Sequence, residues 1–272
     1  MKHIAETWFF LLFVSAGFLL MPAGEAIGAG QLNYQALNNL ASASLKTNEV
    51  GFMFLGSSTV IIKVADQLIL VDPADYFDAK ALEALKPGGV NVVFYTHGHG
   101  DHFKLDEAVK LYERFKPFVI CEPSIVAQFQ QKIPDEKMIS ATPDKSFTAG
   151  KITVDAISGK HPGGIVLYRM TVEGVTLFHG GDSGYVPLGG YPSQLAFLPA
   201  GGASPTASPG DAVRMVSDLK PQTAVIFHGD DKQYAAFKSQ ISQAYPKIKV
   251  IVPKANALNK VTIEPAGPVP AE

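Results

Sequence analysis

One six-residue segment constrains the fold of this 272-residue chain more than any other. Residues 97–102 read His-Gly-His-Gly-Asp-His and follow residues 91–95, an apolar run typical of a buried strand. Apolar side chains then recur at helical spacing over residues 105–115, with acidic residues in the first turn and basic residues near the end, which suits the helix dipole. The segment is therefore expected to form the loop between a strand and a helix.

The spacing of this motif suits the binding of two metal ions. Alternate residues of an extended chain share a face, so His97 and His99 can reach one point together. Asp101 and His102 lie where the chain turns into the helix, and they can face a second point close by. One loop is thus expected to offer ligands to two metals.

The motif is specific. With 7 His and 14 Asp in the sequence, a match by accident has a chance of about 2 × 10⁻⁴. Gly98 and Gly100 are expected to permit a tight backbone path between the ligands. The main alternative is a structural zinc site, which normally uses a closed set of four Cys or His ligands. Two metals with a carboxylate leave open positions instead, as a catalytic site requires.

Further candidate residues stand where a strand would deliver them to the rim of a sheet. His161 lies in a glycine-rich loop, and His228 ends the apolar run Thr223–Phe227. Asp182 lies in a loop that follows a strand candidate, Val175–His179. Each of these three residues could therefore join the motif.

Strand and helix patterns alternate along the rest of the chain. Strands are predicted at Thr59–Val64, 68–71, Phe118–Cys121, 165–172, Val175–His179, 195–198, Thr223–Phe227, 250–252 and 261–263. Helices are predicted at residues 211–219 and 232–245. Such a mixture indicates an α/β domain with helices outside and sheets inside.

The order of the candidate ligands resembles that of the metallo-β-lactamase superfamily. Residues 54–59 (Phe-Leu-Gly-Ser-Ser-Thr), 70–73 (Leu-Val-Asp-Pro), 196–202 and 219–221 are similar to the branch that contains ascorbate-phosphate lactonases and related metal-dependent hydrolases. The resemblance spans roughly residues 50–252. It implies a single α/β domain, the four-layered αββα sandwich.

The resemblance also implies which residues bind each of the two metals. One metal is assigned to His97, His99 and His161, the second to Asp101, His102 and His228, and Asp182 would bridge the two. No cysteine stands at a ligand position, which argues against antibiotic hydrolysis. Lys104 stands where several branches carry an acidic residue.

A two-metal site of this kind predicts hydrolytic chemistry. Two metals about 3.5–4 Å apart share a water and lower its pKa toward neutrality, so no serine or cysteine nucleophile is needed. The expected reaction cleaves an ester-like bond, such as that of a lactone, thioester, phosphodiester or amide. The expected cofactors are two divalent metal ions, zinc first, with manganese or iron as alternatives.

Three residues are the candidates for catalysis. Asp101 and Asp182 would act as metal-ligating carboxylates, and His179 could donate a proton to the leaving group. For His179 a buried core histidine is the alternative. Two functions compete with a hydrolase of a small molecule such as a lactone: a phosphodiesterase acting on a lipid or nucleotide, and a non-catalytic metal-binding periplasmic protein.

Other polar residues near the motifs have predicted supporting roles. Asp72 is expected to orient a ligating histidine. Asp230 could do the same, but an exposed turn carboxylate is the favoured interpretation. Lys160 and Ser183 flank ligands and could contact an anionic substrate. Cys121 ends an apolar run and is expected to be a buried residue.

The first 30 residues are typical of an export signal. An apolar run over residues 8–21 is followed by Pro22 and then by small residues, which predicts a signal peptide cleaved after Ala26. An uncleaved anchor is the alternative, although the run is short for a membrane span. The predicted organisation is a signal peptide (1–26), a partly helical lead-in (27–49), the hydrolase domain (50–264) and a loose tail (265–272). A periplasmic or extracellular location follows.

The balance of positive and negative residues indicates which kinds of partner to expect. The 23 Lys+Arg and 25 Asp+Glu residues give a formal net charge of −2, which provides no general field for nucleic acid. We therefore expect a small-molecule substrate, no nucleic-acid partner, and no stable membrane span once the signal is cleaved. The single cysteine excludes an intrachain disulfide and any CxxC metal motif.

Overall fold

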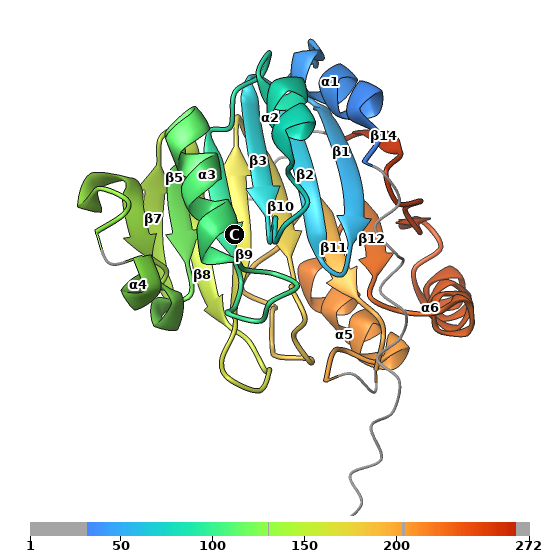
Figure 1. The fold of residues 1–272 in the computed structure, drawn as a ribbon. Helices are drawn as coiled ribbons and strands as arrows, with labels where there is room; N and C mark the ends of the chain where they lie inside the picture. Colours follow the sequence, from blue (N-terminus) through green and yellow to red (C-terminus); the bar gives the residue numbers. More distant parts are fainter. Residues whose placement is uncertain (1–31, 130, 203–204, 265–272) are drawn as a thin grey trace, which may run out of the picture.

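The computed structural model describes residues 32–129, 131–202 and 205–264 (Figure 1). The predicted signal peptide (1–26) and the predicted tail (265–272) lie outside the described residues. Among the residues that the structure describes, no helix has both the length and the apolar character needed to cross a bilayer.

In the part of the chain that the structure describes, the first sheet has seven strands, in the order β14-β1-β2-β3-β4-β5-β6. Its strands are β1 (Glu49–Gly56), β2 (Thr59–Val64), β3 (Gln67–Val71), β4 (Val92–Tyr95), β5 (Phe118–Cys121), β6 (Met138–Ser140) and β14 (Leu258–Thr262). Pairing is antiparallel from β14 to β3 and parallel from β3 to β6.

The second sheet has the same plan, in the order β13-β12-β11-β10-β9-β8-β7. Its strands are β7 (Lys145–Ala149), β8 (Ile152–Ser158), β9 (Val166–Val172), β10 (Val175–His179), β11 (Leu195–Pro199), β12 (Thr223–Phe227) and β13 (Lys249–Ile251). Pairing is antiparallel from β7 to β10 and parallel from β10 to β13. Each sheet thus combines an antiparallel half with a parallel half.

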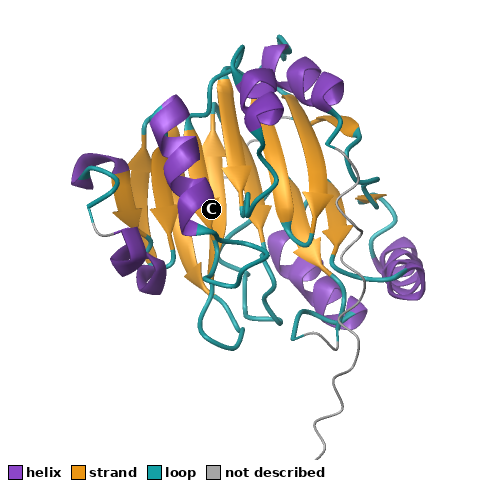
Figure 2. Cartoon of the chain, in the orientation of Figure 1, coloured by secondary structure: helices purple, strands orange, loops and turns teal. Residues whose placement is uncertain are grey.

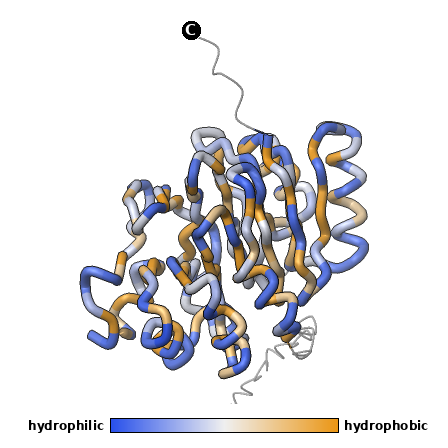
Figure 3. The backbone as a smooth tube through the Cα atoms, turned by 90° about the horizontal axis from the view of Figure 1, so that it is seen from above, coloured by the Kyte–Doolittle hydropathy of each residue, from blue (hydrophilic) through white to orange (hydrophobic). Residues whose placement is uncertain are grey.

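Helices cover the outer face of each sheet (Figure 2). They are α1 (Tyr34–Ser42), α2 (Ala79–Leu85), α3 (Leu105–Phe115) and α4 (Pro123–Phe129) on the first sheet, and α5 (Pro209–Leu219) and α6 (Asp231–Ala244) on the second, with a short 3₁₀ turn at Asp135–Lys137. Along their turns hydrophobic and hydrophilic residues alternate (Figure 3), as expected of helices that bury one face.

Among the described residues, hydrophobic side chains form three clusters that fill the spaces between the layers. One lies between the two sheets, one between the first sheet and α1–α4, and one between the second sheet and α5–α6. Strand β2 shows the cause: Val60, Ile62 and Val64 point to the inter-sheet cluster, while Ile61 joins the helix-facing one. Three such interfaces make a four-layered αββα sandwich, so the predicted fold class is confirmed.

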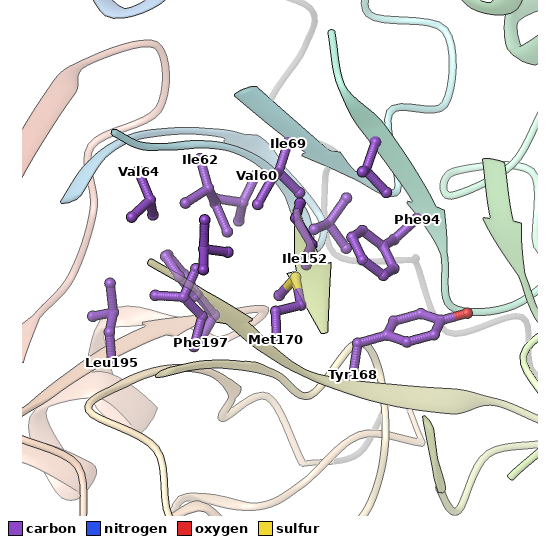
Figure 4. Packing of buried hydrophobic residues seen from close by; sticks show 14 of the residues in the cluster. Val60, Ile62, Val64, Ile69, Phe94, Ile152, Tyr168, Met170, Leu195 and Phe197 are labelled. Atoms are coloured by element: carbon purple, nitrogen blue, oxygen red, sulfur yellow. The ribbon is translucent and has the colours of Figure 1, made fainter. Parts of the chain in front are cut away.

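The inter-sheet cluster is the largest of the three. Figure 4 shows side chains of the first sheet (Val60, Ile62, Val64, Ile69, Phe94) opposite those of the second (Ile152, Tyr168, Met170, Leu195, Phe197). Aromatic pairs cross the gap: Phe52 and Phe197 meet edge to face, and the rings of Phe94 and Tyr168 lie 4.8 Å apart. This packing fixes the two sheets relative to each other.

The strand predictions agree with the structure where the chain is apolar and buried. Thr59–Val64, Phe118–Cys121, Val175–His179 and Thr223–Phe227 have the predicted bounds. The sequence patterns missed α2, α4, β1, β6, β7 and β8. Within the segment predicted as a lead-in, α1 packs its buried Leu37 and Leu40 into the cluster on the first sheet, so this helix belongs to the packed layers.

Candidate metal centre

The predicted ligands come from four loops, and each loop follows the end of a strand. β4 leads into residues 97–102, β8 into His161, β10 into Asp182, and β12 into His228. The first sheet thus supplies one loop and the second sheet supplies three. A backbone hydrogen bond connects the first of these loops to the second sheet: Val166 N, at the start of β9, donates to Thr96 O at 3.0 Å.

One group of ligand atoms consists of three histidine nitrogens. His97 Nε2 lies 3.1 Å from His99 Nδ1, and His161 Nε2 lies 3.2 Å from the same nitrogen. His97 is buried, His161 is half-buried and His99 is exposed. The three nitrogens lie within 4.8 Å of one another, which is close enough for one metal ion. This group corresponds to the first predicted metal position.

The second group is centred on the Asp182 carboxylate. Its Oδ2 lies 3.1 Å from His102 Nε2 and 3.0 Å from His228 Nε2. Asp101 Oδ2 lies 3.4 Å from the same nitrogen of His102. The other carboxylate oxygen, Asp182 Oδ1, is buried and has no hydrogen-bond partner among the described residues. A buried acceptor without a partner is costly, so this oxygen fits a metal ligand.

The two groups adjoin each other. His97, which belongs to the first, also comes within 4.8 Å of the ligand atoms of His102 and Asp182. The structure thus brings all seven predicted metal ligands into one centre, with Asp182 on the side of His102 and His228.

The histidines are held by their second ring nitrogens. His102 Nδ1 lies 3.0 Å from Asp72 Oδ2, and His97 Nδ1 lies 3.0 Å from Thr96 Oγ1. His161 Nδ1 donates to the carbonyl oxygen of Asp182 at 3.0 Å. Such contacts fix the tautomer and the ring orientation, and they leave the other nitrogen free for a metal.

Asp72 collects these contacts at the base of the centre. Its Oδ1 accepts a hydrogen bond from Thr96 N at 2.7 Å, and its Oδ2 accepts from Thr96 Oγ1 at 2.7 Å and Ser58 Oγ at 2.8 Å. Burial raises the pKa of Asp72, but the charge and hydrogen bond of His102, together with the neighbouring His179 and His97, outweigh burial and lower the pKa. The sequence predicted a supporting Asp72 but missed Thr96 and Ser58. Thr96 could have been found, because it stands between the strand and His97.

The electrostatics of the centre suit a cation. Burial lowers the pKa of His102, but Asp72, Asp101 and Asp182 outweigh it and raise the pKa well above its ordinary value. Burial likewise opposes ionisation of Asp182, yet hydrogen bonds from His102 and His228 hold its pKa far below its usual range. The carboxylates therefore stay ionised, and they place negative charge that a cation would neutralise.

His97 behaves differently from His102. Burial and the neighbouring charge of His102 lower the pKa of His97 to about 4. His97 is therefore neutral at pH 7, which is the form that binds a metal.

Comparison with known proteins identifies the family. A family model described as "Beta-lactamase superfamily domain" matches residues 52–228, more than half of the chain. The chain belongs to the metallo-β-lactamase superfamily. The matched region begins in β1 and ends at His228, so it contains the whole set of predicted ligands.

Two relatives in sequence are named metal-dependent hydrolases. The UPF0173 metal-dependent hydrolase of Thermococcus kodakarensis is 28% identical over 196 residues, covering 64% of this chain and 82% of that protein. The corresponding protein of Methanopyrus kandleri is 25% identical over 223 residues, covering 73% and 94%. The chain is accordingly a metal-dependent hydrolase of the superfamily.

Two solved structures share the fold. Igni18, a metallo hydrolase from Ignicoccus hospitalis, has a TM-score of 0.66 at 21% identity and covers 79% of this chain and 100% of its own. The metallo-β-lactamase fold protein YhfI of Bacillus subtilis has a TM-score of 0.61 at 15% identity, with the same coverage. These similarities support the sandwich fold of this hydrolase.

The glycines that shape the centre of this superfamily member are not the predicted ones. Gly98 and Gly100 do not have positive φ, and a Cβ atom at either would meet at most Ile125, at 3.8 Å. The tight backbone is instead at Gly181, directly before Asp182. Gly181 has φ of 48°, and a Cβ there would lie 3.1 Å from Thr96 Oγ1. The backbone is thus constrained in the loop that carries Asp182. There Gly181 contacts Thr96, which follows β4 of the other sheet.

His179 lies inside the molecule beside the centre of this hydrolase. Its side chain is fully buried. Its Nε2 donates to Ser58 O at 2.9 Å, and its Nδ1 accepts from Gly181 N at 3.1 Å. Both ring nitrogens therefore have protein partners, which favours the alternative of a core histidine over a proton donor to a leaving group. Burial also lowers the pKa of His179.

The remaining candidates have mostly structural partners. Ser183 is buried, and its Oγ accepts from Lys160 N and donates to Gly184 O. Lys160 itself is exposed beside His161. Asp230 is the N-cap of α6 in a capping box, so the turn interpretation was the better one.

Two further side chains lie away from the ligands. Lys104 forms an exposed ion pair with Asp75. Cys121 is buried, and burial raises the pKa of its thiol to about 12. As predicted, this cysteine is a core residue.

Proposed function

We propose that this protein hydrolyses an ester-like bond of a small molecule, such as a lactone, with two divalent cations in its centre. The observation that carries the proposal is the position of the Asp182 carboxylate. Its Oδ2 contacts both His102 and His228, and its Oδ1 is buried without a hydrogen-bond partner among the described residues. A carboxylate so placed suits a ligand shared between two cations.

The donor set fits the proposed cations. One cation would be held by His97, His99 and His161, the other by Asp101, His102 and His228, with Asp182 common to both. Imidazole and carboxylate donors suit zinc, which we propose as the metal. When bound, such cations supply Lewis-acid activation of a water molecule and of the attacked oxygen.

The chain's own residues orient the histidine ligands and leave one side of the centre open to a substrate. Asp72 and Thr96 hold the rings of His102 and His97, so that their Nε2 atoms face the centre. The exposed side of the centre is formed by His99 and by Asp101, whose side chain is 56% exposed. A substrate would approach from this side. Lys160, which is exposed and directly precedes His161, would contact an anionic group of the substrate.

A hydrolysis panel tests the proposed reaction. Initial rates of the purified, metal-loaded chain would be compared on a lactone, a thioester, a phosphodiester and a β-lactam, each with and without a chelator, and bound metal would be counted by elemental analysis. We expect two zinc ions per chain and chelator-sensitive cleavage of the lactone. Cleavage of the phosphodiester alone would replace the lactone with a phosphodiesterase function. Two bound metals with no cleavage of any substrate would favour a non-catalytic protein.

We also propose that the protein is exported. The support is the signal-like pattern of residues 1–26 in the sequence. Fusion of residues 1–30 to a reporter that is active only outside the cytoplasm tests it. An active reporter is expected, and an inactive reporter retained in the cytoplasm would contradict export.

A further inference from the structure

His179 contacts three separate segments: one of them touches two ligands of the second group, and the other two lead directly into Asp182 and His228. These segments are the turn between β1 and β2, the loop after β10, and the end of β12. The side chain is fully buried at the end of β10, between the two sheets. Its role can therefore be derived from what it holds together.

The first contact fixes the turn between β1 and β2. His179 Nε2 donates to Ser58 O at 2.9 Å. The hydroxyl of Ser58 lies 2.9 Å from His102 Nδ1, and the neighbouring Ser57 hydroxyl donates to Asp101 Oδ2 at 3.1 Å. The position of this turn therefore affects two ligands of the second group.

The second contact fixes the loop that carries Asp182. Gly181 N donates to His179 Nδ1 at 3.1 Å, and Gly181 directly precedes Asp182 in the chain. Because Ser58 O can only accept and Gly181 N can only donate, a single neutral tautomer of His179 satisfies both partners. The imidazole thus connects the two sheets at this point.

The third contact fixes the end of β12. The rings of His179 and Phe227 are stacked, with centroids 5.5 Å apart and an interplanar angle of 23°. Phe227 directly precedes His228, whose Nε2 contacts Asp182. The orientation of the strand end that delivers His228 therefore depends on this packing.

We propose that His179 is a positioning residue that sets the affinity of the second metal position, a role that rests on the two-metal function proposed above. Its hydrogen bonds and ring contacts among the described residues reach none of His97, His99 and His161. The first group is linked to the Asp182 loop through His161 Nδ1, which has a second acceptor in Pro205 O at 3.1 Å. Loss of His179 therefore weakens the second position more than the first.

Two substitutions separate hydrogen bonding from packing. His179→Phe keeps an aromatic ring against Phe227 but removes both hydrogen bonds, whereas His179→Gln keeps an amide donor and acceptor. Leu37→Ala is the control, because it truncates a buried residue in α1, outside the inter-sheet cluster that contains Phe227. All are made in the full-length chain. Zinc affinity at each position is measured by competition with a chromophoric chelator, and hydrogen exchange is followed in residues 180–183.

We expect His179→Phe to bind its second zinc about 10–100-fold more weakly than the wild type, and its first zinc with a smaller loss, because Asp182 is common to both proposed positions. The Gly181 amide should exchange faster in this variant, and His179→Gln should restore part of both properties. Leu37→Ala should lower thermal stability while both zinc affinities stay unchanged. If His179→Phe fails to fold, a loss of zinc affinity in His179→Gln that is larger at the second position than at the first supports the positioning role, and an equal loss at both positions, or no loss at either, overturns it.

Unchanged zinc affinities and unchanged exchange in His179→Phe would overturn the inference, and so would an equal loss of the second zinc in Leu37→Ala. The proposed function fails by different results. A wild-type chain that binds two zinc ions but hydrolyses nothing leaves the positioning role intact. A wild-type chain that binds a single zinc contradicts the two-metal function, and the exchange of the Gly181 amide then decides whether His179 positions the loop.

Discussion

The side chains of the centre divide their ring and carboxylate atoms between metal-facing and protein-facing contacts. His97, His102 and His161 each place one nitrogen in the centre, and each has a protein oxygen near the other. The single hydroxyl of Thr96 contacts both a supporting carboxylate and a metal ligand. It donates to Asp72 Oδ2 and lies 3.0 Å from His97 Nδ1. With its one proton given to Asp72, this oxygen accepts from His97, so Asp72 influences both groups of ligands.

Thr96→Val tests this dependence on one hydroxyl. Valine has a similar shape but lacks the hydroxyl, so Asp72 loses one donor and His97 loses the acceptor for its Nδ1 proton. We expect metal affinity to fall about 10–100-fold, as measured by competition with a chelator. Thr96→Ser keeps the hydroxyl and should bind metal nearly as the wild type does. Equal losses in the two variants would show that the methyl group, and not the hydroxyl, matters.

Asp182→Asn tests the shared carboxylate. An amide keeps the shape but loses the charge, and it offers a metal one neutral oxygen in place of two charged ones. We expect the loss of one of two metals and a fall in turnover of at least about 100-fold. Asp155→Asn is the control: Asp155 pairs with Arg169 on the second sheet, outside the centre. Near wild-type turnover in Asp182→Asn would remove this residue from the proposed ligand set.

Among the helices and strands, the sequence predicts best the bounds of strands that are buried on both faces. β2 and β12 are buried along their whole length, and their apolar runs predict their observed bounds. β7 is largely exposed and lies at a sheet edge, and β6 has only three residues, so neither gives a clear pattern. α4 begins at a proline and spans seven residues, too few for a clear helical period.

The residues of the metal centre likewise differ in whether the sequence predicts them. The ligands could be predicted because histidine and aspartate at this spacing are rare, and because they follow strands. Ser58 could not, since hydroxyls are common, and neither could the partners of Thr96 and His179, because these partners come from distant segments. The backbone constraint likewise lies at Gly181 rather than at Gly98, because it arises from contact with Thr96 across the sheets.

Gly181→Ala tests the backbone of the Asp182 loop. A left-handed φ of 48° disfavours any residue with a Cβ, and here that atom would also press on Thr96 and Ile165. We expect stability to fall by about 1–2 kcal/mol, with loss of metal binding as Asp182 shifts. Gly89→Ala is a matched control, because Gly89 has φ of 61° and open space around it. Denaturant unfolding and chelator competition would compare the two, and equal metal binding in both variants would contradict the expected contact.

At the scale of the whole molecule, the centre joins two sheets that are also held by apolar packing and by hydrogen bonds such as that from His179 to Ser58 O. The first sheet supplies residues 97–102, and the second supplies His161, Asp182 and His228. A metal bound by both sets acts as a cross-link between the two halves of the sandwich. The unfolded chain does not hold these ligands together, so the free energy of metal binding adds to the free energy of unfolding.

Metal removal should therefore lower the melting temperature of the whole domain. At free zinc about 100-fold above its dissociation constant, binding adds about 2.7 kcal/mol per site, which corresponds to a shift of about 5–10 °C for a domain of this size. The shift should grow with zinc concentration, and calorimetry with and without chelator measures it. Asp182→Asn should show a smaller shift, because it holds one metal less, whereas Asp155→Asn should match the wild type. A melting temperature that does not respond to zinc would mean that the ligands of one sheet bind metal without those of the other, and the cross-link between the halves would have to be abandoned.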